Sequence, residues 1–312
     1  KYVCPLGTFN FLYSTASPFQ ITARNLDTCA TCVGHDCING NSSQIGCQLE
    51  LYVPTIKSNM NCTLCLDCAK ACPHDNVMLA SRPPGDELFR QSWPHRLDLA
   101  LLAVIATFIG LVNAFAMTPP VYRLEAQMAA LLNTTREALV LGIVFAVGAV
   151  LLPVALAFGA AAASNTWSKG EQSIKRTLMD YAYAFVPLGF AVWTAHYLFH
   201  FLTGAMTIVP AMQTFWSETV GLPILGTPNW TLAQWFVPPV GVIQAIQLVI
   251  VVVGTVAGGW LMWQTAARHN VSNRRDAWRA AGPWLFVLAL VAIAAIYVFL
   301  LPMEMRGSAL SG

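Results

Sequence analysis

Charged residues are scarce in this chain. They make up 10% of its 312 residues, and the formal net charge is +2. Soluble domains carry about 25% charged residues, so most of this chain is not expected to face water. There is no basic stripe of the kind that follows a phosphate backbone, and we therefore expect no nucleic-acid partner.

The common catalytic patterns are also missing. The sequence has no nucleotide-binding fingerprint, no phosphate-binding loop and no recognisable Ser/His/Asp grouping. Cysteine is absent after residue 72, so all nine cysteines fall in the more polar part of the chain, residues 1–96. This distribution predicts two regions in different solvents and leaves the cysteines as the candidate chemistry.

The last four cysteines form a run of known meaning. They spell Cys62-x2-Cys65-x2-Cys68-x3-Cys72 followed by Pro73, the ligand run of bacterial [4Fe–4S] ferredoxins. The first three thiolates of such a run surround one cluster, and the fourth points to the other cluster of a pair. Pro73 then ends the turn.

The first half of the constellation is less regular. Its spacing is Cys29-x2-Cys32-x4-Cys37-x9-Cys47, and no proline follows Cys47. Crossed ligation predicts one cluster on Cys29, Cys32, Cys37 and Cys72, and a second on Cys62, Cys65, Cys68 and Cys47. The alternatives are disulfides, two zinc sites, or a first half that holds a [3Fe–4S] cluster or none.

Cys4 is left over, in a Cys4-Pro5 pair. A Cys-Pro motif, a two-cluster segment and membrane helices together resemble the NapH/NosR/FixG group of membrane polyferredoxins. The resemblance rests on residues 4–73. It implies a C-x3-C-P motif whose first cysteine precedes Lys1, and hence an N-terminal part ahead of this sequence. The long Cys32–Cys37 gap and the missing proline after Cys47 depart from the pattern.

The fold class expected is an α-helical membrane protein with a two-[4Fe–4S] ferredoxin-like domain. Residues 1–28 are the Cys-Pro segment, residues 29–96 the cluster domain and residues 97–312 the membrane domain. Five apolar runs are long enough to cross a bilayer core of about 30 Å, near residues 97–117, 138–163, 181–206, 240–263 and 283–301. The segment 207–239 has no Lys or Arg, and we expect it to fold back along the outer interface.

Lys and Arg set the expected orientation. Residues 1–96 and the loops 164–180 and 264–282 carry 14 of them, whereas the opposite segments carry three. The positive-inside rule therefore predicts cytoplasmic clusters and a periplasmic C-terminus in a bacterial cytoplasmic membrane.

Two histidines lie within a predicted span. His196 and His200 are four residues apart and so share a helix face. Ionisable residues inside a membrane are functional candidates. The readings left open are neutral packing, a haem b completed by another helix, a quinone contact, or copper or zinc with Met206. Asp98 and Asp180 are expected to be exposed at helix ends.

The function expected is transfer of single electrons through two [4Fe–4S] clusters. The donor is cytoplasmic or at the level of the quinone pool, and the acceptor is in the membrane or periplasm, within a respiratory or photosynthetic chain. The partners are membrane lipid and other redox subunits. The resemblance also suggests a maturation factor that reduces a metal such as copper. A third hypothesis is a subunit whose clusters are structural.

Overall fold

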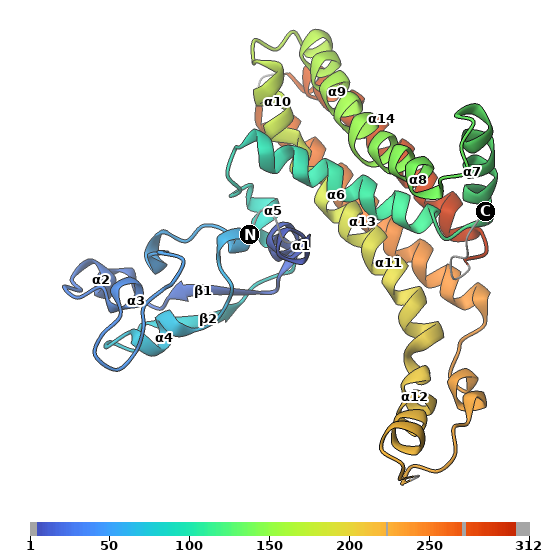
Figure 1. Ribbon diagram of the computed structural model, residues 1–312. Helices are drawn as coiled ribbons and strands as arrows, with labels where there is room; N and C mark the ends of the chain where they lie inside the picture. Colours follow the sequence, from blue (N-terminus) through green and yellow to red (C-terminus); the bar gives the residue numbers. More distant parts are fainter. Residues whose placement is uncertain (1–4, 223, 270–272, 304–312) are drawn as a thin grey trace. The chain divides into compact units, whose positions relative to one another are not determined.

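The computed structural model describes residues 5–222, 224–269 and 273–303 of the chain. It divides into two compact units, residues 1–103 and 104–312, and the division falls within one helix. Most of the described residues are helical, and strands are confined to the first unit (Figure 1).

The first unit is built on a two-stranded antiparallel sheet. Strand β1 (Phe19–Ala23) pairs with β2 (Val77–Ser81), with Phe19 opposite Ser81 and Ala23 opposite Val77. The short helices at one end of this sheet are α2 (Leu26–Ala30), α3 (Asp36–Asn39) and α4 (Asp67–Ala71), and α1 (Pro5–Tyr13) lies at the other end (Figure 1). The remaining elements are η1 (Ser14–Ala16), η2 (Val53–Thr55), η3 (Asn59–Asn61) and α5 (Asp86–Arg90). Pairing β1 with β2 brings the two cysteine-rich halves together.

A small core and a buried ion pair hold this unit. Ile21, Val53 and Val77 pack with the thiols of Cys37 and Cys68. Nearby, Arg82 Nη2 lies 3.0 Å from Glu87 Oε2, and the side chains are 6% and 0% exposed. The same carboxylate accepts hydrogen bonds from the Ser58 hydroxyl and, at 3.0 Å, from the Asn59 backbone N–H. Glu87 thus fixes the segment that leads into the second cysteine run.

The second unit is a helical bundle. Its elements are α6 (Leu97–Phe115), which begins in the first unit, α7 (Pro119–Leu131), α8 (Glu137–Phe145), η4 (Ala146–Leu151), α9 (Leu152–Ser168), α10 (Ile174–Tyr181), η5 (Ala182–Phe185), α11 (Val186–Gly204), η6 (Ala205–Thr207), α12 (Ile208–Thr214), η7 (Phe215–Thr219), η8 (Trp230–Gln234), α13 (Val240–His269) and α14 (Arg274–Leu300). Helix α13 packs against α11 and α14, and α14 packs against α9 (Figure 1).

Small residues allow the close packing of α13. A Cβ atom on Gly254 would lie 2.5 Å from Ala191 Cβ and 2.7 Å from the carbonyl oxygen of Pro187 on α11. A Cβ on Gly258 would lie 2.7 Å from the carbonyl oxygen of Ala184. Glycine at these two positions therefore serves packing within the bundle, as small residues do between membrane helices.

Among the described residues, five helical segments are long and apolar enough to cross a membrane: residues 97–115, 137–168, 174–219, 240–269 and 274–300. This confirms the predicted α-helical membrane protein with five such segments. The fifth helix begins nine residues before the predicted start, because the side chain of Asn273 accepts a hydrogen bond from Arg275 N–H and caps it. Pro283, taken as the first residue of that span, lies inside α14.

The segment after residue 206 is also more helical than the sequence suggests. Helix α12 and η7 extend the third apolar segment to Thr219. Beyond it, Trp230 and Trp235 are 59% and 69% exposed. Their placement at the outer interface of a membrane stays a prediction.

Candidate metal centres

Four cysteines from both halves of the constellation line one cavity. They are Cys29, Cys32, Cys37 and Cys72, here called quartet 1. Cys29 comes from α2, Cys37 from α3, and Cys72 directly follows α4. The other residues around this cavity include His35, Tyr52, His74 and Asn76.

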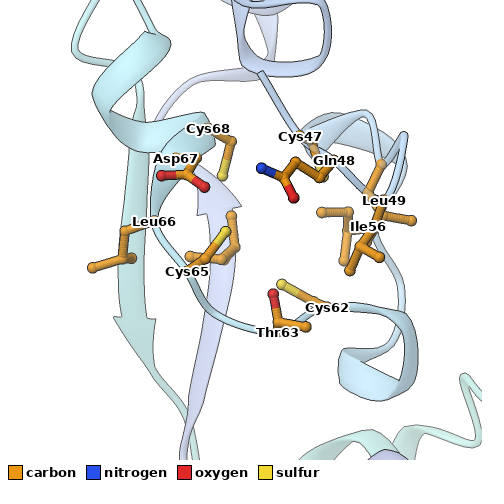
Figure 2. A pocket seen from close by; sticks show the side chains of 12 residues that line it. Cys47, Gln48, Leu49, Ile56, Cys62, Thr63, Cys65, Leu66, Asp67 and Cys68 are labelled. Atoms are coloured by element: carbon orange, nitrogen blue, oxygen red, sulfur yellow. The ribbon is translucent and has the colours of Figure 1, made fainter. Parts of the chain in front are cut away.

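The remaining four cysteines line a second, separate cavity of about 170 Å³. They are Cys47, Cys62, Cys65 and Cys68, here called quartet 2. Figure 2 shows the sulfur atoms of Cys62, Cys65 and Cys68 turned toward the middle of this cavity. Each cavity therefore takes three cysteines from one half of the sequence and one from the other.

Electrostatic coupling divides the thiols in the same way. Burial raises the pKa of the Cys37 thiol, and the nearby Cys29, Cys72 and Cys32 raise it further. Burial likewise raises the pKa of the Cys68 thiol to about 11, with further contributions from Cys62, Cys47 and Cys65. The neutral form of these two thiols is thus favoured until a cation is present, and metal binding would release protons from them.

The two quartets lie very close to each other. Cys68 and Cys72 stand at the two ends of α4, about 6 Å apart along the axis at 1.5 Å per residue. Cys47 and Cys37 are joined directly, because Cys47 N–H donates to the Cys37 carbonyl oxygen at 3.2 Å. Groups held in the two cavities would be neighbours.

The backbone around the thiols adopts left-handed conformations that most residues avoid. Leu64 and Leu66, between the cysteines of the second run, have φ values of +56° and +68°. Such a conformation costs a non-glycine residue about 1–2 kcal/mol. Alternating right- and left-handed residues turn successive N–H groups to one side, and the resulting concavities bind anions, Fe–S clusters among them.

Several N–H groups donate to the sulfur atoms. Leu64 N–H donates to Cys62 Sγ at 3.4 Å, and Asn76 N–H to Cys72 Sγ at 3.4 Å. The side-chain amide of Asn76 donates to Cys29 Sγ at 3.1 Å. Asn76 therefore joins the first and last cysteines of quartet 1.

Asn76 is also anchored on its other side. Its amide nitrogen donates to the Asn25 carbonyl oxygen at 2.7 Å, and its amide oxygen accepts from Asn25 N–H at 2.9 Å. The side chain is buried. Tyr52 makes a further link, since its hydroxyl donates to the Cys29 carbonyl oxygen at 3.3 Å.

Comparison with known proteins adds no assignment. No family model matches this chain, and neither a curated protein nor a solved structure does. The residues of the cavities themselves indicate what the cavities can hold. Those residues are four thiols per cavity, N–H donors to the sulfur atoms and left-handed turns, and this set suits a cysteine-ligated four-iron cluster.

The sequence also allowed disulfides or zinc sites at these cysteines. The eight cysteines in the described ranges are all free thiols. Within those ranges, no three His, Cys, Asp or Glu side chains lie closely enough together to hold one metal ion, and zinc binding by the cysteines stays an alternative. Cys4 lies outside the described residues.

The irregular first half has a structural cause. The two extra residues between Cys32 and Cys37 form a left-handed turn at His35, with φ of +47°, which starts α3. The longer gap before Cys47 is closed by a turn in which Asn41 N–H donates to the Gln44 carbonyl oxygen at 2.8 Å. Gln48 takes the place of the missing proline, and its amide points into the second cavity (Figure 2).

The intramembrane histidines lie side by side on α11. The ring centroids of His196 and His200 are 4.8 Å apart. His196 is 2% exposed, and its Nε2 lies 3.3 Å from the amide nitrogen of Asn113 on α6. The polar side chain that faces His196 from another helix is thus Asn113. The spacing of residues in the sequence did not reveal this contact. Haem, quinone or copper binding by this pair stays a prediction.

Asp180 was predicted to be exposed, and that prediction is wrong. Its side chain is 2% exposed, and its carboxylate lies 3.2 Å from Arg176 Nε and 3.6 Å from His269 Nε2. The end of α13 covers the end of α10, which the linear sequence does not indicate. Asp98 does lie at an exposed helix end, beside Arg96.

Proposed function

We propose that this protein is a membrane-bound electron carrier with two [4Fe–4S] clusters, one held by each quartet. The observation that supports this proposal best is the crossed distribution of the cysteines. Cys72 lies with the first three cysteines and Cys47 with the last three, each set around its own cavity. Two-cluster ferredoxins share ligands in this way.

The protein side chains would hold and insulate the clusters. When bound, such a cluster supplies one-electron redox chemistry, with a potential set by charge, hydrogen bonds and solvent exposure. Cys37 and Cys68 are buried, whereas Cys65 is exposed. The N–H donors around the thiols would offset the negative charge that each cluster adds. An electron would then enter or leave the quartet 2 site most readily on the side of the exposed Cys65.

The closeness of the quartets supports a relay. Tunnelling rates fall steeply with distance. Here the two sites are only about one turn of α4 apart, and Cys37 and Cys47 connect them through a backbone hydrogen bond. An electron that reaches one cluster would pass quickly to the other.

The Lys and Arg distribution supports a cytoplasmic position for the first unit. On this proposal the cytoplasmic clusters exchange electrons with another redox subunit and pass them toward the membrane. Reporter fusions test the orientation. Green fluorescent protein fused after Gly170 should fluoresce, and the same protein fused after Gly226 should stay dark. The reverse pattern would overturn the orientation.

Metal analysis of anaerobically purified protein tests the clusters. We expect about eight iron and eight sulfide per chain, and after dithionite reduction an electron paramagnetic resonance spectrum with two interacting centres. Two zinc ions per chain, or iron for a single centre, would refute the proposal.

Single substitutions test the grouping. Cys32→Ser should alter one reduction step and Cys65→Ser the other, because each removes a ligand from one quartet only. Cys4→Ser is the control, since the crossed ligation predicted from the sequence assigns Cys4 to neither cluster, and it should leave iron content unchanged. If both ligand variants altered the same step, the crossed assignment would be wrong.

A further inference from the structure

His35 occupies the unusual part of the first cysteine motif. It lies in the two-residue extension between Cys32 and Cys37, and its backbone takes the left-handed conformation that begins α3. Its carbonyl oxygen accepts from Ile38 N–H at 2.9 Å and from Asn39 N–H at 3.1 Å. The extension therefore places His35 among the residues that line the quartet 1 cavity.

The His35 ring packs against a neighbouring aromatic side chain, but its Nδ1 atom makes no hydrogen bond to the described residues. His35 packs edge-on against Tyr52, with ring centroids 5.2 Å apart and an interplanar angle of 80°. Its Nδ1 is shielded from solvent and has no hydrogen-bond partner among the described residues. An unsatisfied buried polar atom costs about 1–3 kcal/mol, so a nitrogen left in this state beside a cavity points to a ligand within the cavity.

We infer that His35 donates a hydrogen bond from Nδ1 to a sulfur of the cluster in quartet 1 and raises its reduction potential. This inference rests on the proposed function. Reduction adds a negative charge to the cluster, and a hydrogen-bond donor stabilises the reduced form more than the oxidised form. The neutral imidazole can donate from Nδ1 while Nε2 carries no proton.

An iron ligand is the other role that a histidine on this wall could take. Quartet 1 already offers four thiols, and a four-iron cluster needs one ligand for each iron. Hence the imidazole is left to act on a sulfur rather than on an iron. His35 is therefore a tuning residue, which changes the potential without holding the cluster.

The test is a redox titration of His35→Leu followed by electron paramagnetic resonance. Leucine removes both ring nitrogens and is compatible with this backbone, since Leu64 and Leu66 already adopt positive φ. We expect normal iron content and a lower potential for the step that Cys32→Ser also alters. The equilibrium constant for reducing that centre should fall about tenfold, which is 59 mV for one electron.

Two further variants separate tuning from packing. His35→Asn keeps an N–H donor and suits positive φ, and it should restore most of the potential. His95→Leu is the matched control, because His95 is an exposed histidine of the same unit that lines neither cavity, and it should leave the potential unchanged. Double-resonance spectra of the reduced protein should show an exchangeable proton coupling that disappears in His35→Leu.

The outcomes are distinct. A wild-type protein without two clusters would refute the proposed function itself. Two clusters with an unchanged potential in His35→Leu would refute the inference alone. Loss of iron from His35→Leu, or a strong nitrogen coupling in the wild type, would assign His35 as an iron ligand and overturn the tuning role.

Discussion

Replacing Asn76 by alanine should weaken the first unit and the quartet 1 site together. The change removes three side-chain hydrogen bonds, two with Asn25 and one to Cys29 Sγ. At about 1 kcal/mol each, the expected loss in the free energy of unfolding is about 3 kcal/mol. On the proposed function, the bond to sulfur would favour the reduced cluster by about 1 kcal/mol, so the potential of the quartet 1 step should fall by about 40 mV.

Asn59 provides the matched control. It is also a buried asparagine of the first unit, and its amide donates to the Phe19 carbonyl oxygen at 2.7 Å, but among the described residues no hydrogen bond joins its side chain to a sulfur. Asn59→Ala should therefore lose stability with both potentials unchanged. Thermal unfolding and a redox titration of the two variants provide the comparison. If Asn76→Ala left both potentials unchanged, or moved the step altered by Cys65→Ser, the argument from the sulfur contact would fail.

Three more predictions concern thiol chemistry, the buried ion pair and the bundle. In the metal-free protein at pH 8, a pKa of about 11 for Cys68 instead of 9.0 makes the reactive thiolate about 100-fold rarer. Iodoacetamide should therefore label Cys68 about 100-fold more slowly than an ordinary thiol, and denaturation should abolish the difference. Equal labelling rates in the folded protein would contradict this prediction. Glu87→Gln should lower the free energy of unfolding by about 3 kcal/mol because it leaves a buried arginine without its partner, whereas Asp86→Asn, in a partly exposed pair, should cost less than about 1 kcal/mol. Gly254→Val should destabilise the bundle by about 1–3 kcal/mol through overpacking, and Gly142→Val, with open space around it, should not; equal melting temperatures would refute the packing argument.

Long apolar runs made the helical segments predictable from the sequence. Length and hydropathy are local properties, so the number of candidate spans follows from them directly. Boundaries depend on local caps, and the start of α14 was missed because Asn273 lies outside the apolar run. The grouping of the eight cysteines could also be anticipated, since their spacing encodes which thiols share a turn.

The supporting residues could not be anticipated in the same way. Asn76 acts on Cys29 from 47 positions away, and that contact exists only because β1 and β2 pair. His35 lies inside the motif, but sequence spacing does not reveal that its nitrogen is shielded and unpaired. Asp180 was misjudged because its cover comes from the end of α13. In each case a long-range contact determines the environment of the side chain.

The sharing of cysteines between the two halves also matters while the chain is being made. Cys29 is synthesised early, yet the set to which it belongs is complete only when Cys72 has followed. At about 5–20 residues per second, its thiol is exposed for seconds. The other set is complete at Cys68, only four residues earlier. Both sets of thiols are therefore completed almost at once, and a chain that stalls before Cys68 contains neither complete set.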